Sequence, residues 1–269
     1  MAAELPSPCC MRGSLHNGNP TGTEETIHGL QTYVARPETG PTKGTLVIIP
    51  DAFGWDFVNL RVLADSYAKR GKFEVLMPDF HFGDPFTKSG LDSVFALKGY
   101  EPPFYVRWWR MLSTFPVFLF WAWTHRQSVT LPIITNFFKA LREAHSSTGE
   151  KIGVAGFCWG GRYAILVDSY VDAIYSAHPS FLQIPSEVEP VTKPISFALG
   201  DKDVVVPMSK VEQIKGVLKK KENLDSEVII YEGMEHSFAV RGNPEIELSR
   251  KGLEGSETQC VEWFTKHLK

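Results

Sequence analysis

Cysteine is scarce in this chain. Among 269 residues there are four cysteines, and no apolar signal-peptide core precedes them: Cys9, Cys10, Cys158 and Cys260. We therefore expect neither a disulfide framework nor secretion, and a reducing compartment, the cytoplasm, is the expected location. For the adjacent Cys9 and Cys10 we favour an irregular terminal segment, with lipidation or redox chemistry as the alternative.

Charge of one sign is also lacking. The 28 Lys and Arg residues nearly balance 31 Asp and Glu residues, which gives a formal net charge of −3 and a pI near 6.3. Without a basic face, nucleic acid is not an expected partner. Residues 111–123 are apolar, but the run contains Pro116 and is too short to span a bilayer. Contact with a membrane surface is the less favoured reading of this run.

Motifs that bind metals or cofactors are absent too. The sequence holds no H-E-x-x-H and no paired C-x-x-C, and its eight histidines have no ligand spacing. It also lacks a G-x-x-x-x-G-K-[ST] phosphate loop and the full G-x-G-x-x-G dinucleotide pattern. We expect no metal and no cofactor.

A nucleophile elbow is the most informative feature that is present. Residues 156–161 read G-F-C-W-G-G, between the apolar run Ile152 to Ala155 and a helix-compatible stretch that starts at Arg162. This is the strand, tight turn and helix context of G-x-S-x-G, with Cys158 in place of Ser. Small residues allow the strained turn, and the helix N-terminus favours a thiolate. Cys158 is thus a candidate nucleophile, although most free cysteines are small buried hydrophobes.

Two later loops supply the partners that a nucleophilic thiol needs. The strand-like run Ile195 to Leu199 precedes Gly200-Asp-Lys-Asp203, and the run Val228 to Tyr231 precedes a loop that contains His236. The chain order nucleophile, acid, histidine is that of α/β-hydrolases. The pattern predicts that His236 accepts the thiol proton and that Asp203 fixes the tautomer of the ring.

These motifs resemble the dienelactone hydrolase family, and the chain looks most like its fungal members. The resemblance rests on G-F-C-W-G-G, G-D-K-D at 200–203, H-S-F at 236–238 and P-D-A-F-G at 50–54, with a similar stretch at 32–37. It covers nearly the whole length except a central segment. It implies a triad of Cys158, His236 and Asp203 that acts on lactones or related esters.

The same resemblance assigns roles around the thiol. A Glu in the family helps to convert the thiol to thiolate, and Asp51 stands at that position here, one methylene shorter; a loop-capping carboxylate is the alternative. The backbone N–H groups of Ala52 and Trp159 would form the oxyanion hole. Val240 replaces an Arg that grips a substrate carboxylate in the family's type member. Arg241 is one position further on, where a side chain points in a different direction from that of residue 240, so an anionic lactone is not the expected substrate.

The order of the other segments predicts an α/β fold. Strands are expected at 30–35, 45–49, 73–78 and 173–177, and helices at 59–70, 131–145, 211–218 and 260–268, with Gly71 ending the first helix and residues 1–24 irregular. This alternation favours the α/β-hydrolase fold, a mostly parallel central sheet with helices on both faces, as one domain over residues 1–269. The marked motifs all follow strands, so they should meet at one edge of the sheet.

Residues 81–130 interrupt this rhythm with a concentration of aromatic side chains. We expect an inserted, aromatic-rich cap that makes the site poor in water, although some of these rings must be ordinary core. The residues expected to contact an apolar or aromatic small-molecule substrate, in the cap and the neighbouring loops, are Phe53, Trp55, Phe82, Tyr105, Trp108 and Arg241.

The expected activity is hydrolysis of a lactone or ester through a thioester on Cys158. Two alternatives stay open. The same triad could serve a cyclisation, isomerisation or C–C cleavage of a polyketide-like substrate, or the scaffold could bind a ligand without catalysis. The sequence indicates neither the substrate nor the oligomeric state.

Overall fold

The computed structural model describes residues 16, 18–86, 105, 109, 116–117 and 119–269. Its strands form one sheet in the order β1-β2-β4-β3-β5-β6-β7-β8. The strands are β1 (Thr23–Ile27), β2 (Leu30–Ala35), β3 (Thr45–Ile49), β4 (Glu74–Pro78), β5 (Ile152–Phe157), β6 (Ala173–Ala177), β7 (Ile195–Gly200) and β8 (Ser226–Tyr231). The pairs from β4 to β8 are parallel, and β2 pairs antiparallel with both β1 and β4. The predicted mostly parallel sheet is confirmed.

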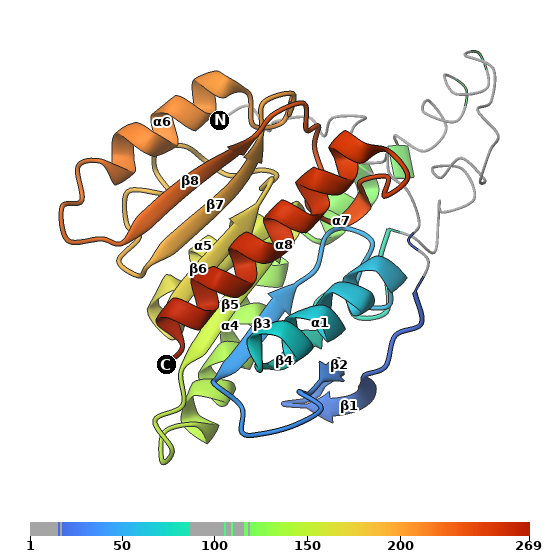
Figure 1. The fold of residues 1–269 in the computed structure, drawn as a ribbon, viewed down its shortest axis with the longest axis vertical. Helices are drawn as coiled ribbons and strands as arrows, with labels where there is room; N and C mark the ends of the chain where they lie inside the picture. The colour runs from blue at the N-terminus through green and yellow to red at the C-terminus, as the bar shows by residue number, and fades with distance from the viewer. Residues whose placement is uncertain (1–15, 17, 87–104, 106–108, 110–115, 118) are drawn as a thin grey trace.

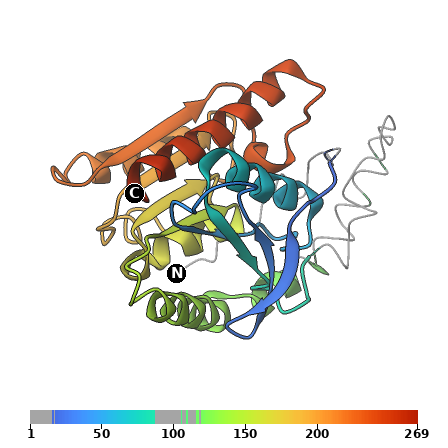
Figure 2. The same ribbon diagram turned by 60° about the horizontal axis from the view of Figure 1, so that its bottom comes forward.

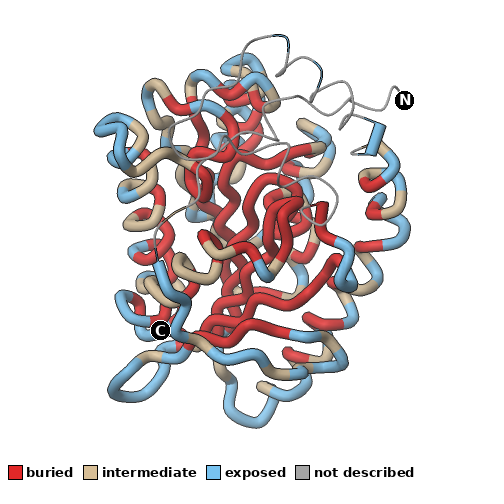
Figure 3. The backbone as a smooth tube through the Cα atoms, turned by 90° about the vertical axis from the view of Figure 1, so that its right-hand side faces the viewer, coloured by how far each residue is buried: buried red, intermediate tan, exposed pale blue. Residues whose placement is uncertain are grey.

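Helices cover both faces of this sheet (Figures 1 and 2). They are α1 (Val58–Gly71), α4 (Gln127–Ala144), α5 (Trp159–Leu166), α6 (Met208–Leu218), α7 (Phe238–Arg241) and α8 (Glu247–His267), with a 3-10 turn η2 (Asp168–Tyr170). Helices α1 and α8 pack together on one face, and α4 and α5 lie on the other (Figure 1). Every residue of β3, β5, β6 and β7 is buried, as expected for strands covered on both faces. In Figure 3 the buried stretches, in red, run through the middle of the molecule.

Several boundaries differ from the sequence prediction. Gly71, predicted to be the residue that stops the first helix, is the last helical residue of α1, and the left-handed residue that follows the helix is Lys72, with φ of 59°. Gly71 is required for another reason: a Cβ there would lie 2.0 Å from the ring of Phe73. Strand β1 begins at Thr23, inside the segment expected to be irregular, because its partner β2 supplies the ladder.

Helices α4 and α8 both begin earlier than predicted. Helix α4 includes Pro132 within its second turn, a residue that usually marks a helix start. Helix α8 starts at Glu247, and its first half is polar and contains Gly252, which hides the periodic pattern. A Cβ on Gly252 would lie 2.3 Å from the sulfur of Met234, so this glycine permits close packing of the helix.

The carboxyl ends of the parallel strands meet at one edge, as predicted. Ile49 of β3 lies beside Gly156 of β5, and Gly200 of β7 lies beside Tyr231 of β8. The loops that follow these strands carry Asp51, Cys158, Asp203 and His236. Residues far apart in the chain are thereby brought to one place.

Candidate active site

The turn at Cys158 has the strained geometry expected of a nucleophile elbow. Cys158 follows β5 directly, has φ of 51° and ψ of −112°, and precedes the first residue of α5. Its backbone N–H donates to the carbonyl of Ala177 at 3.1 Å. A Cβ on Gly160 would lie 2.1 Å from the carbonyl oxygen of Ile49, so only glycine allows α5 to approach the loop after β3. The thiol therefore stands at a helix N-terminus, next to the Asp51 loop.

The thiol, the imidazole and the carboxylate form one connected chain. Cys158 Sγ lies 3.2 Å from Nε2 of His236, and Nδ1 of His236 lies 2.8 Å from Oδ2 of Asp203. Oδ1 of Asp203 accepts the N–H groups of Val205 and Val206, which fixes the carboxylate. All three triad side chains are buried.

The charges of the neighbouring triad side chains favour a protonated His236 ring. Burial alone would lower the pKa of His236, but the charge of Cys158 and the hydrogen bond to Asp203 outweigh it and raise that pKa. The arrangement suits a thiolate–imidazolium pair, because each ion stabilises the other.

Ser180 joins this group, and the sequence analysis did not identify it. Its Oγ lies 3.3 Å from Cys158 Sγ and 3.1 Å from His236 Nε2. Ser180 follows β6, whose end lies at the same sheet edge as the other catalytic loops. Its place after a parallel strand was the available signal, but the serine belongs to none of the motifs that we used.

His178, also missed, packs behind the catalytic ring. Its ring is T-shaped to that of His236 with centroids 5.2 Å apart, and it also contacts Phe238. Neither of its ring nitrogens has a hydrogen-bond partner among the described residues. Burial, with the positive charges of His236 and Arg241, lowers the pKa of His178 well below its usual value, so it is a neutral ring here.

Asp51 and Arg241 form a buried ion pair beside the thiol. Arg241 Nε lies 3.2 Å from Asp51 Oδ2, and both side chains are almost fully buried. The guanidinium also lies 4.4 Å over the ring of Phe53, and it donates to Ser237 Oγ. Arg241 was expected among the substrate contacts, with a direction different from that of residue 240; in the structure the short helix α7 turns its side chain toward the Asp51 loop.

Burial governs the acidity of Asp51. It raises the pKa of this carboxyl, and the charge of Cys158 raises it further, whereas Arg241, the N–H of Phe53 and His236 lower it; the resulting pKa is about 6. Oδ1 of Asp51 accepts the N–H of Phe53 at 2.9 Å. Asp51 therefore both caps its own loop and senses the charge on the thiol.

Ala52 and Trp159, whose N–H groups are predicted to form an oxyanion hole, lie in the loop after β3 and at the start of α5. Ala52 follows Asp51, and Trp159 is the first residue of α5, where backbone N–H groups lack partners within the helix. Both residues are buried. The close packing at Gly160 holds their two loops together.

Aromatic rings cover Trp159. The ring of His81 lies 4.4 Å from that of Trp159, and Trp121 stacks on His125 at 4.6 Å while contacting both Trp159 and His81. Phe86 links Trp121 to Phe53 through edge contacts. The described end of the expected cap thus packs directly onto the elbow.

The remaining candidates for substrate contact differ widely in exposure. Phe53 is fully buried, whereas Phe82 is 59% and Tyr105 62% exposed. Trp55 is partly buried under the guanidinium of Arg61, 4.8 Å away. Trp108 and most of residues 87–115, like Cys9 and Cys10, lie outside the described residues.

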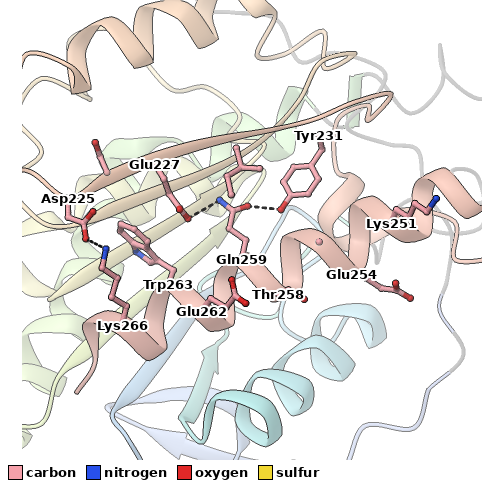
Figure 4. A pocket seen from close by; sticks show the side chains of 13 residues that line it. Asp225, Glu227, Tyr231, Lys251, Glu254, Thr258, Gln259, Glu262, Trp263 and Lys266 are labelled. Carbon is pink, nitrogen blue, oxygen red and sulfur yellow. Dashed lines mark hydrogen bonds and ion pairs between the residues drawn. The ribbon is translucent and has the colours of Figure 1, made fainter.

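A groove of about 660 Å³ lies elsewhere, between the edge strand β8 and helix α8 (Figure 4). Its polar side chains pair with one another: Tyr231 donates to Gln259 at 2.8 Å, and Lys266 pairs with Asp225. None of the triad residues lines it. It is therefore a surface groove separate from the thiol.

Within the described ranges, no helix is both long and apolar enough to cross a membrane. The same part of the chain contains no group of three or more His, Cys, Asp or Glu side chains arranged to hold a metal ion. Neither Cys158 nor Cys260 is part of a disulfide bond.

Comparison with known proteins agrees with this geometry. The model of the Dienelactone hydrolase family matches residues 30–268. Two fungal proteins are each 29% identical: Hydrolase tropI of Talaromyces stipitatus over 272 residues, with 99% of each chain covered, and Hydrolase pyvD of Aspergillus violaceofuscus over 271 residues, with 100% of each covered. The crystal structure of a putative dienelactone hydrolase from Klebsiella pneumoniae matches with a TM-score of 0.63 at 17% identity, covering 92% of this chain and 99% of that one.

At 17% identity, the similarity to the Klebsiella pneumoniae structure is evidence for the fold alone. The family match covers most of the chain. Together with a thiol, imidazole and carboxylate in contact and in the chain order of an α/β-hydrolase, these matches lead to one conclusion. The chain belongs to the dienelactone hydrolase family and is a hydrolase of the α/β-hydrolase fold.

Proposed function

We propose that this hydrolase cleaves esters or lactones through a thioester on Cys158. The observation that carries the proposal is the continuous contact from Sγ through the His236 ring to Asp203, with distances of 3.2 and 2.8 Å. A thiol alone at a helix N-terminus would be reactive, but hydrolysis also needs a base that can activate water. His236 is placed where it can accept the proton of the thiol and later the proton of the attacking water.

The reaction would proceed in two halves. His236 takes the thiol proton, and the thiolate attacks the carbonyl carbon; the N–H groups of Ala52 and Trp159 stabilise the resulting oxyanion. The tetrahedral intermediate collapses with loss of the alkoxide, which takes the proton from His236. Water then gives a proton to His236 and attacks the thioester, and the departing Cys158 sulfur recovers that proton.

The surroundings of the thiol favour an apolar or aromatic substrate without a carboxylate. Phe53, Phe86 and Trp121 supply connected rings next to the elbow. The charge of Arg241 is already matched by Asp51, so a carboxylate-bearing substrate would have to displace a buried ion pair. Burying one large ring contributes about 1.5–3 kcal/mol, which is enough to select substrates by shape.

We also infer that residues 81–130 form a cap within a single domain spanning residues 1–269. The support comes from His81 and Trp121, at the start and near the end of this stretch, whose rings both contact that of Trp159 at the elbow. A cytoplasmic location fits a nucleophile that must stay a free thiol.

Hydrolysis of p-nitrophenyl acetate tests the proposal. Turnover should be abolished by iodoacetamide, and mass spectrometry should find an acyl group on Cys158 when the reaction is quenched early. Turnover that survives alkylation would overturn the assignment. Absent ester turnover with a reactive thiol would instead favour a specialised cyclisation, isomerisation or C–C cleavage.

A further inference from the structure

The loop after β6 is tied to the nucleophile through its backbone. Ser180 N donates to the carbonyl of Cys158 at 2.8 Å, and Cys158 N donates to Ala177 O at 3.1 Å. The N–H of His178 in turn donates to Ala198 O in β7 at 2.9 Å. Ser180 is thereby fixed relative to both the elbow and the sheet, and its side chain has little freedom to leave.

The three polar side chains at this point form a triangle. The distance from Ser180 Oγ is 3.3 Å to Cys158 Sγ and 3.1 Å to His236 Nε2. The third side, from Sγ to Nε2, is 3.2 Å. Ser180 is 2% exposed and Cys158 is 3% exposed. Such burial strengthens each hydrogen bond and makes an unpaired charge costly.

A count of hydrogens shows which ionisation state the triangle prefers. In the thiolate–imidazolium pair, Nε2 carries one hydrogen that Sγ and Oγ can share, and the hydroxyl donates its own hydrogen to the thiolate. In the neutral pair the hydroxyl can bond only to uncharged partners. Hydrogen bonds to a charged acceptor are about twice as strong as neutral ones, so the hydroxyl stabilises the ion pair more than the neutral pair.

We propose that Ser180 is a positioning residue that stabilises Cys158 as a thiolate by donating to Sγ while its oxygen faces Nε2 of His236. This inference deepens the proposed function, on which it rests for its catalytic meaning. After acylation the sulfur loses its charge, and the neutral Nε2 becomes the better acceptor for the hydroxyl hydrogen. Ser180 would then hold the ring in place until water arrives.

Several other groups face the pair and must stay constant in any test. They are Asp203 from the loop after β7, Asp51 from the loop after β3, His178 from the loop after β6 and Arg241 from α7. Replacement of Ser180 by Ala changes none of them. A shift in thiol ionisation in that variant would report the hydroxyl itself.

The experiment is the pH dependence of iodoacetamide alkylation of Cys158 in the full chain, followed by mass spectrometry. Ser180→Ala should raise the midpoint of alkylation by about one pH unit, a tenfold change in the ionisation equilibrium of the thiol. The matched control is Ser176→Ala: Ser176 is also buried and lies on β6, but its hydroxyl donates at 3.0 Å to Gly161 O, which belongs to no triad residue. Its midpoint should stay at the wild-type value.

A second pair of variants covers a failure of Ser180→Ala to fold. Thr and Val have nearly the same shape, so Ser180→Thr should keep the wild-type midpoint while Ser180→Val shifts it upward. A midpoint unchanged in folded Ser180→Ala, or equal in the Thr and Val variants, would overturn the proposal. Alkylation needs no ester turnover, so a chain that shows the shift but hydrolyses no ester would refute the proposed function and leave the role of Ser180 intact.

Discussion

Two buried cysteine thiols in this chain have opposite surroundings. Cys158 is 3% exposed, lies at a strained turn at the N-terminus of α5, and contacts His236. Cys260 is 0% exposed and lies inside α8, where burial raises the pKa of its thiol although the Tyr67 hydroxyl lowers it. Burial is nearly equal in the two, so it does not decide reactivity. We expect the helix terminus and the charged partner to decide it.

Replacing each of the two cysteines by Ala tests this comparison and gives the largest expected effect. Cys158→Ala should lower kcat/KM for ester hydrolysis by about 10⁴-fold or more, because the triad acts as a unit, and should leave the fold intact. Cys260→Ala should keep its activity and lose about 1–2 kcal/mol in the free energy of unfolding, measured by urea denaturation. Retention of more than a tenth of the activity in Cys158→Ala would remove the thiol from the mechanism.

A second contrast separates two aspartates in one loop. Asp203 contacts the ring of His236, whereas Asp201 accepts the N–H of Gly233. Asp203→Asn should lower kcat by roughly 10²–10⁴-fold, since the tautomer of His236 is no longer fixed, and His236→Ala should lower it by about 10³-fold or more. Asp201→Asn should change kcat little. Equal losses in the two aspartate variants would mean that the loop, and not the carboxylate contact, matters.

Much of the fold and the triad could be predicted because the local signals agree with one another. Cys158, Asp203 and His236 each follow a strand, and parallel strands end at one edge, so order and spacing suffice to bring them together. Gly71 shows the limit: the sequence indicated that it ends α1, but the turn residue is Lys72, and Gly71 is needed for contact with Phe73.

Side-chain direction and unpatterned polar residues could not be predicted. The direction of Arg241 toward Asp51 was not predicted, because no sequence rule shows how α7 turns between Ser237, with φ of 70°, and Gly242. Ser180 belongs to no motif, and its proposed role depends on a backbone hydrogen bond to Cys158 that only the three-dimensional structure reveals.

A third contrast concerns two tryptophans on one helical turn. Trp121 is 3% exposed and contacts Trp159, whereas Trp123 is 61% exposed, with the guanidinium of Arg126 lying 4.9 Å over its ring. If the cap selects the substrate, Trp121→Phe should change KM, or the preference between acyl groups of different size, by about tenfold. Trp123→Phe should change neither. The rate of Cys158 alkylation should be the same in both. If Trp121→Phe lowers the melting temperature and leaves the substrate preference as in wild type, Trp121 is a core residue only.

The smallest expected effect concerns Asp51, whose carboxyl has a pKa of about 6. As pH rises through 6, ionised Asp51 places a second negative charge near Sγ and opposes the thiolate. Alkylation of wild-type Cys158 should therefore show an inflection near pH 6, and Asp51→Asn should remove it and alkylate severalfold faster at neutral pH. Asp56→Asn is the matched control, because Asp56 lies in the same loop but is exposed.

The stability of the same variant gives an independent check of the sign. An acid whose pKa is raised from 3.8 to about 6 by folding stabilises the native state below pH 3.8, and this contribution is lost as pH rises through 6. The loss is on the order of 3 kcal/mol for about two pH units. In Asp51→Asn this pH dependence should vanish between pH 4 and 7, while the unpaired Arg241 lowers stability by a roughly constant amount. If urea denaturation gives parallel curves for wild type and variant across that range, Asp51 ionises normally and only caps its loop.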